Sequence, residues 1–251
     1  MNNKIKKRHV ICIKWGDRYS SDYVNKLFLM VDRNITLSYQ FHCLTDSDKG
    51  IDSRINILKI PKNEVHLWGW WQKISIFKEV FFGLQGDLLF IDLDMLILNN
   101  IDDFFLYEQG KLCVTENYYN DKWISSCVMR VTIGSNPKIW SDFWENSDEI
   151  CERLKKRGDQ AYIKEAAENY VFWPNNWVLY YKNHCKYRLL PINLGLPTKV
   201  LSYISKIANL YANEPVDGKI LAFQGKPNIH EIAEYPISKY RAAPWIKKYW
   251  K

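Results

Sequence analysis

The chain has 251 residues, 47% of them hydrophobic, which is enough for one or two domains with a sizeable core. Its net charge of +7 comes from the ends, because residues 1–10 carry four cations and residues 238–251 carry five, with no acid in either segment. The rest of the chain therefore carries 7 − 9 = −2, which argues against a nucleic-acid-binding surface.

We expect neither a signal peptide nor a membrane span in this sequence. The start is polar and basic rather than apolar, and no apolar run approaches the roughly 18 residues of a membrane span. The six cysteines show no Cys-x-x-Cys spacing and lie mostly in apolar runs, where a thiol behaves as a small hydrophobe. We expect a reduced, cytoplasmic protein.

The first sixty residues predict the beginning of a parallel sheet. Apolar runs at 9–14, 37–44 and 55–60 are typical of buried strands, and Pro61 ends the third. Between the first two, Ser20 is placed to cap a helix whose apolar positions are Tyr23, Val24, Leu27, Phe28 and Val31. Strand, crossover helix and strand predict a parallel sheet, whose carboxyl edge collects ligands.

Residues 87–98 are an apolar run interrupted by Asp92 and Asp94, and they predict a strand buried on both faces. Buried carboxylates are costly, so we expect both where the strand ends and opens into a crevice. Residues two apart on an extended chain point to one side, where both can bind a hard cation. The alternative is a capped strand end with solvated acids. The chain has a second Asp-x-Asp tripeptide, Asp46-Ser47-Asp48, in an expected loop, so the tripeptide alone is poor evidence for a metal site.

The remaining elements are less regular. In chain order, we expect a helix after residues 66–73 with apolar positions Trp70, Ile74, Phe77 and Phe81, strands at 111–115 and 123–130, a helix starting at Pro137, a helix capped by Asp159, an amphipathic helix at 200–211 and a strand at 219–223. We therefore predict one compact α/β unit with a sheet-forming first half and a more irregular second half.

Several residues are predicted to share the carboxyl edge of the sheet. The first loop carries Lys14, Trp15 and Tyr19, and the second strand ends at Thr45 and Asp46, which together are placed to hold a base and ribose. Ordinary turn chemistry is the alternative for Thr45 and Asp46. Lys73 is placed to reach a phosphate, with a solvated helix face as its alternative, and the local sequence favours a simple N-cap for Asp159.

These motifs, in this order, resemble the GT-A glycosyltransferases, in particular bacterial family eight-like galactosyl- and glucosyltransferases of lipopolysaccharide and capsule synthesis and their uncharacterised relatives. The matching segments are spread over most of the chain: 13–16 with Tyr19 and Tyr23, Thr45-Asp46, 70–73, 90–94, 125–129, 158–160 and 223–227. The resemblance implies a Rossmann-like, mostly parallel sheet flanked by helices in a single domain over 1–251, with 1–100 binding the nucleotide and 101–251 the sugar and acceptor.

The resemblance also implies residue roles. Asp92 and Asp94 would hold Mn²⁺ or Mg²⁺ against the diphosphate of a UDP-sugar, Lys73 and Lys226 would contact phosphate, Asp46 the nucleoside, and Asp159 and Gln160 the donor sugar. Such enzymes usually present a histidine as a third metal ligand before the Gly-Lys-Pro segment. Here Gln224 occupies that position, and the nearest histidine is His230.

The predicted function is metal-dependent transfer of a hexose from a UDP-sugar to a saccharide or glycolipid acceptor. The family likeness favours retention of configuration, whereas an inverting transfer needs a base, for which Asp159 and Glu116 are candidates. Of the many aromatic residues, Trp71, Trp173 and Trp177 are candidates for sugar contacts.

The basic, aromatic segment 240–251 is typical of a contact with an anionic membrane surface, here the inner face of the cell membrane. The alternative is a tail with Trp245 folded back on the body.

Two other functions are compatible with an acidic strand end. A haloacid-dehalogenase-like phosphatase also uses Asp-x-Asp, but its strand should lie near the start of the chain and be followed by Gly-Thr rather than Met95-Leu96. A catalytically silent carbohydrate-binding protein with the same fold is the second alternative, suggested by the substitution at Gln224.

Overall fold

The computed structural model describes residues 7–118, 123–185, 196–197, 199–200, 203–204, 211–238 and 240–251. Within these residues a seven-stranded sheet has the order β3-β2-β1-β4-β7-β6-β8. Its strands are β1 (Arg8–Lys14), β2 (Gln40–Thr45), β3 (Asn56–Lys59), β4 (Asp87–Ile91), β6 (Cys113–Glu116), β7 (Ile124–Thr132) and β8 (Val171–Phe172). All neighbours are parallel except at β7, which runs opposite to β4 and β6, so the prediction of a mostly parallel α/β sheet is confirmed.

The expected strand over 87–98 is two strands rather than one. After β4 the chain leaves the large sheet, and β5 (Met95–Ile97) joins a three-stranded sheet with β10 (Ile220–Ala222) and β9 (Val178–Tyr180). The break falls at residues 92–94, because a continued strand would carry two carboxylates into an apolar interior. The expectation that the acids lie at a strand end is confirmed, and that of a continuous strand is wrong.

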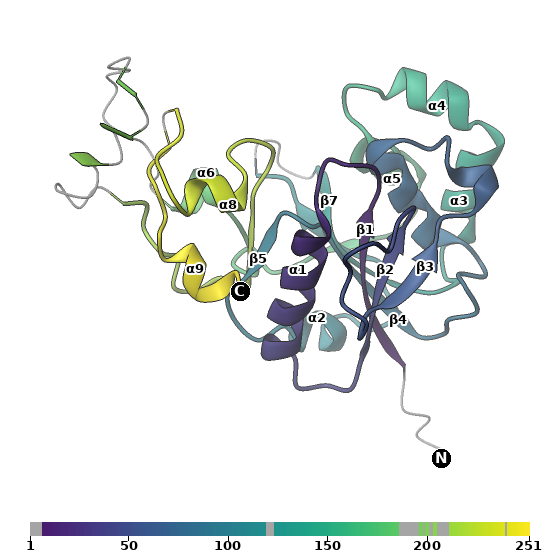
Figure 1. The fold of residues 1–251 in the computed structure, drawn as a ribbon. Helices are drawn as coiled ribbons and strands as arrows, with labels where there is room; N and C mark the ends of the chain where they lie inside the picture. Colours follow the sequence, from purple (N-terminus) through teal and green to yellow (C-terminus); the bar gives the residue numbers. More distant parts are fainter. Residues whose placement is uncertain are drawn as a thin grey trace.

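Helices cover both faces of the large sheet (Figure 1). One face packs against η2 (Gly69–Phe77), α3 (Pro137–Glu145), α4 (Ser147–Arg153) and α5 (Asp159–Ala166). The other packs against α1 (Ser21–Asn34), α2 (Asp103–Leu106), the small sheet, α8 (Ile229–Ile232) and α9 (Ile246–Tyr249). Short η1 (Lys62–Glu64) and α6 (Tyr181–His184) complete the described elements.

Residues 69–77 form a 3₁₀ stretch, η2, where an α-helix continuing to Phe81 was expected. Its sequence is rich in aromatic and β-branched residues, and the Ser75 hydroxyl hydrogen-bonds the carbonyl of Gln72. Trp71 is fully buried there, with its ring stacked on Phe143, so its prediction as a sugar contact is wrong. The expected helix at 200–211 lies largely outside the described residues.

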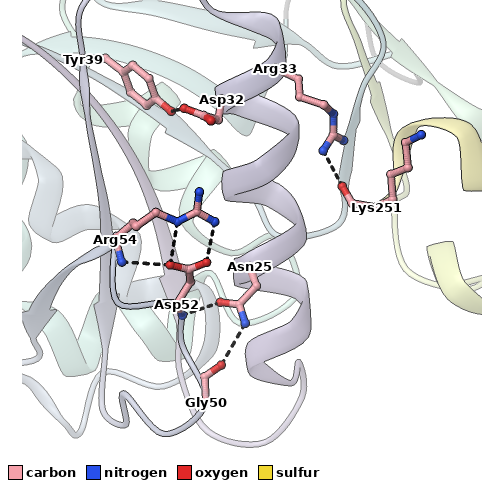
Figure 2. Close-up of polar contacts among 8 residues, drawn as sticks. All are labelled: Asn25, Asp32, Arg33, Tyr39, Gly50, Asp52, Arg54 and Lys251. Carbon is pink, nitrogen blue, oxygen red and sulfur yellow. Dashed lines mark hydrogen bonds and ion pairs between the residues drawn. The ribbon is translucent and has the colours of Figure 1, made fainter.

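The C-terminal segment is folded onto α1. The Arg33 guanidinium donates to the backbone carbonyls of Tyr249 and Lys251, each at 2.6 Å, and Figure 2 shows the second contact. The Trp245 indole donates to the Ala212 carbonyl at 2.8 Å, as the folded-back alternative predicts. No helix among the described residues is long and apolar enough to cross a bilayer. A peripheral membrane contact of this segment stays a prediction.

The other side of α1 is tied to the loop before β3. Asn25 donates to the Gly50 carbonyl at 2.9 Å and accepts from the Asp52 backbone amide at 2.8 Å, while Asp52 is also paired with Arg54 (Figure 2). The helix is therefore fixed from both sides, which holds the loop at its N-terminus in place beside β1.

Candidate active site

A cavity of about 550 Å³ lies at the carboxyl ends of β1, β4 and β10. Its walls come from the β1–α1 loop, from η2, from the break between β4 and β5, from the start of β7, from the loop before α5 and from the end of β10. The described lining residues include Trp15, Arg18, Tyr19, Trp70, Lys73, Asp92, Asp94, Asn117, Ser126, Lys156, Arg157, Asp159, Gln160 and Gln224.

Lys73 sits between two carboxylates at the base of this cavity. Its Nζ lies 3.1 Å from Asp92 Oδ1 and 3.3 Å from Asp159 Oδ2, and it donates to the Ser126 hydroxyl at 3.0 Å. The side chains of Lys73 and Asp159 are each 7% exposed, whereas that of Asp92 is 32% exposed toward the cavity. One buried cation therefore faces two acids, which leaves this group short of positive charge.

The pKa values in this group follow from that imbalance. Burial raises the pKa of Asp92 to about 7, although the charge of Lys73 opposes the shift. Burial alone would lower the pKa of Lys73, but the charges of Asp159 and Asp92 outweigh it and raise that pKa above its ordinary value. Lys73 is therefore charged at neutral pH, and Asp92 would gain from an additional cation.

Asp94 is oriented by a chain of aromatic residues. The Tyr19 hydroxyl donates to Asp94 Oδ2 at 3.1 Å, and the ring of Tyr19 contacts Tyr23 at 4.9 Å between centroids. The Tyr23 hydroxyl in turn lies 2.7 Å from Nδ1 of His230. Burial raises the pKa of Asp94 while the hydrogen bond from Tyr19 opposes the shift. His230 is thus held by Tyr23 and does not line the cavity.

The loop before α5 needs glycine at position 158. Gly158 has φ of +70°, and a Cβ there would come within 2.8 Å of Nε1 of Trp70, whose indole lines the cavity. The N-cap of α5 is Gly158 itself, so the expectation that Asp159 is the cap is wrong. Asp159 is the first helical residue and turns its side chain inward to Lys73 instead.

Comparison with known proteins gives a structural but no sequence relationship. No protein-family profile matches the chain, and no curated protein matches it. Among solved structures, the galactosyltransferase LgtC in complex with donor and acceptor sugar analogs matches with a TM-score of 0.59 and 10% identity over 88% of both chains.

Two further solved structures match. The glycosyltransferase GlyE of Streptococcus pneumoniae TIGR4 matches with a TM-score of 0.58 and 11% identity over 89% of this chain. The bifunctional glycosyltransferase WbbM matches with a TM-score of 0.57 and 11% identity over 97% of it. The chain covers 56% of the GlyE chain and 51% of the WbbM chain. The fold is the GT-A glycosyltransferase fold.

Within this glycosyltransferase fold, most of the predicted site residues converge. The residues that line the cavity are Trp15, Tyr19, Lys73, Asp92, Asp94, Asp159, Gln160 and Gln224. Their roles stay predictions, since the fold alone does not assign them.

Four predicted residues do not line the cavity: Lys14, Thr45, Asp46 and Lys226. Three of them shape the loops beside it: Lys14 donates to the Gly16 carbonyl at 3.1 Å, Asp46 accepts from the Gly16 amide at 3.0 Å, and the Thr45 hydroxyl donates to the Ser47 carbonyl at 2.9 Å. Lys226 is 77% exposed and pairs with Glu231 at 3.3 Å.

The structure adds three cationic residues that the sequence did not single out. Arg18 lies over the ring of Tyr19 at 5.3 Å, and Lys156 and Arg157 line the cavity wall next to Gly158. All three are exposed, so in sequence they resemble an ordinary solvated surface. Their positions beside Tyr19 and the Gly-Asp-Gln segment are the signal that would have found them.

Proposed function

We propose that this chain is a metal-dependent glycosyltransferase that moves a hexose from a UDP-sugar to a saccharide or glycolipid acceptor. The observation that carries the proposal is the position of Asp92 and Asp94, in the break between β4 and β5, where both line the cavity at the carboxyl edge of the sheet. The likeness of the fold to sugar transferases supports it.

The residues around the break fit a divalent cation. Asp92 and Asp94 both have raised pKa values, which a nearby cation would lower, and Gln224 offers an amide oxygen on the same cavity. The Phe223 amide donates to the Asp94 carbonyl at 3.1 Å, which keeps the Gln224 segment beside the break.

An all-oxygen donor set suits Mg²⁺ or Mn²⁺. The described residues contain no cluster of three or more His, Cys, Asp or Glu side chains placed to hold a metal. The remaining ligands would therefore come from Gln224, phosphate oxygens and water. When bound, such a cation neutralises the negative charge of a departing diphosphate.

The protein's own groups divide into two walls. On the nucleotide side, Trp15 offers a ring for a base and Arg18 a charge-assisted donor for a phosphate, while Tyr19 orients Asp94. On the opposite wall, Asp159 and Gln160 begin α5 and face the same space.

Asp159 is suited to hold a sugar hydroxyl. Its Oδ2 is buried, is ion-paired to Lys73 and receives no hydrogen bond from any described residue. Because Oδ2 is buried against Lys73, the proposed contact with a hydroxyl of the donor sugar falls to the other carboxylate oxygen of Asp159. Gln160, the next residue of α5, lines the same cavity and is the second proposed contact.

The arrangement favours a retaining transfer. Of the two carboxylates considered as bases for inversion, Asp159 is paired with Lys73, and Glu116 lies outside the main cavity. A retaining reaction, in which the leaving phosphate accepts the acceptor proton, requires neither. Analysis of the anomeric configuration of the product tests this part of the proposal.

Isothermal titration with UDP, with and without Mn²⁺, tests the proposal. We expect binding that depends on the metal and is lost in Asp94→Asn, but persists in Asp48→Asn, a matched change in the solvated Asp46-Ser47-Asp48 segment, where Asp48 pairs only with Lys59 among the described residues. Folded protein that binds no UDP with any divalent metal would refute it. UDP binding without turnover of any UDP-hexose would favour the catalytically silent alternative.

A further inference from the structure

A second cavity, of about 450 Å³, adjoins the first. It is bounded by the end of β6, by the segment between β8 and β9 and by α6. Asn117 lines both cavities, so the two meet at this residue. A ligand that fills the first cavity and continues past Asn117 would enter the second.

The second cavity offers an aromatic surface. Tyr118 is 50% exposed and stands edge-on to the ring of His184, with the ring centroids 5.3 Å apart at 77°. Trp173 also lines the cavity, where its indole donates to the Val128 carbonyl at 3.0 Å and is thereby fixed. An exposed tyrosine beside an immobile wall is the arrangement that packs against the C–H face of a pyranose ring.

Polar groups surround this aromatic surface. Asn175 is exposed, and its amide has no hydrogen-bond partner among the described residues. Nδ1 of His184 lies 2.9 Å from the Tyr180 backbone nitrogen, which fixes the ring and leaves Nε2 without a described partner. Amide and imidazole groups both donate and accept, as recognition of vicinal hydroxyls requires.

The charges of the two cavities differ. Arg18, Lys73, Lys156 and Arg157 line the first, whereas no lysine or arginine is among the described residues that line the second, whose one carboxylate is Glu116. A phosphate or nucleotide would therefore be disfavoured in the second cavity, and an uncharged polyol would not.

From these observations, and resting on the proposed function, we infer that the second cavity binds an uncharged sugar unit of the acceptor, distinct from the unit that receives the hexose. The acceptor would then be an oligosaccharide, or a glycolipid with an oligosaccharide head, rather than a single sugar. Tyr118 packs on the ring and Asn175 binds its hydroxyls.

Saturation-transfer NMR tests this with lactose, cellobiose and maltotriose as probes, on full-length protein saturated with UDP and Mg²⁺. We expect at least one probe to bind with Kd of about 10 mM or tighter and UDP not to displace it. Tyr118→Ala and Asn175→Ala should each weaken binding at least about fivefold. Matched controls are Tyr235→Ala, a tyrosine 47% exposed, and Asn176→Ala; neither residue lines either cavity, and both variants should bind like the parent.

Three results would overturn the inference: no probe binds in this range, UDP displaces the probe, or Tyr118→Ala behaves like Tyr235→Ala. A parallel UDP titration on the same samples separates this outcome from the proposed function. Sugar binding without UDP binding would discard the transfer reaction and leave the sugar site, whereas UDP binding without sugar binding would do the reverse.

Discussion

Lys73→Met removes the cation that lies between Asp92 and Asp159 while keeping a side chain of similar length. Deleting one partner of a buried ion pair costs about 3–5 kcal/mol, because an uncompensated charge stays behind. Asp92 is 32% exposed to the cavity, which moderates that cost, so we expect a loss of about 3 kcal/mol. A domain with about 5–15 kcal/mol of stability still folds after this loss.

The destabilisation should depend on pH. Without the charge of Lys73, the folded-state pKa of Asp92 rises above its value of about 7, whereas an unfolded aspartate titrates near 3.8. The folded variant then holds a proton that the unfolded chain has released, so its stability increases as pH falls from about 8 toward 5. We expect the difference from the parent to be smaller at pH 5.5 than at pH 8.

Urea unfolding followed by circular dichroism measures both effects. The control is Lys59→Met, which breaks an exposed pair with Asp48 and should leave the free energy of unfolding close to that of the parent. Adding Asp159→Asn to Lys73→Met removes one of the two stranded charges and should recover about 1–2 kcal/mol. A loss below about 1 kcal/mol in Lys73→Met, or no recovery in the double variant, would refute the conclusion that Lys73 compensates the charges of both Asp92 and Asp159.

Three further predictions follow from other contacts. Burial, and then the neighbouring His9, lower the pKa of His42 to about 4, so the free energy of unfolding should fall by roughly 3 kcal/mol as pH drops from about 6.5 to below 4. Urea unfolding of His42→Phe should show a weaker dependence of stability on pH than the parent, and an equal dependence would contradict this prediction. Arg18→Ala should weaken UDP binding about tenfold in calorimetry without affecting uridine, and an equal loss for uridine would place Arg18 elsewhere. Arg130 is fully buried and donates to four backbone carbonyls, so Arg130→Met should cost about 3–5 kcal/mol in urea unfolding. The exposed Arg153→Met should unfold like the parent, and equal losses in the two variants would contradict the role of Arg130.

The N-terminal half of the fold was predictable because its signals are local. The five apolar positions expected to face inward from α1 are all buried, and β1 to β3 lie within three residues of their expected limits. Apolar runs of strand length and helical spacing determine these elements without knowledge of their partners.

The second half was less predictable because its pairings are distant in sequence. An apolar run does not identify the strand with which it pairs. The sequence therefore predicted neither the antiparallel position of β7 between β4 and β6 nor the assembly of β5, β9 and β10 into a separate sheet. The 3₁₀ form of η2, in the first half of the chain, was missed for a different reason, since apolar spacing alone does not separate a 3₁₀ stretch from an α-helix.

The candidate site divides along a chemical line. Burying a carboxylate inside an apolar run costs free energy, so Asp92 and Asp94 could be identified from the sequence as candidate site residues. Arg18, Lys156 and Arg157 carry no such signal, because exposed cations are normal on any surface. Lys226 was expected to contact phosphate because of the motif around it; here it pairs with Glu231 on α8, outside the cavity lining, and its role stays a prediction.

The same two carboxylates account for the architecture around the site. The ladder of β4 ends at Ile91, with one more bond from the Asp92 amide to the Cys127 carbonyl, and the chain then turns into a different sheet. Because β5 pairs with β10, the turn also brings the end of β10, with Phe223 and Gln224, against Asp94. Thus the large sheet supplies the wall that we propose for the nucleotide, and the end of the small sheet's β10 leads into Gln224. The second cavity borders both, between the end of β6 in the large sheet and β9 with α6 beside the small one. Had β4 and β5 formed one strand of the large sheet, β5 would not pair with β10, and the segment with Gln224 would not be held beside Asp94.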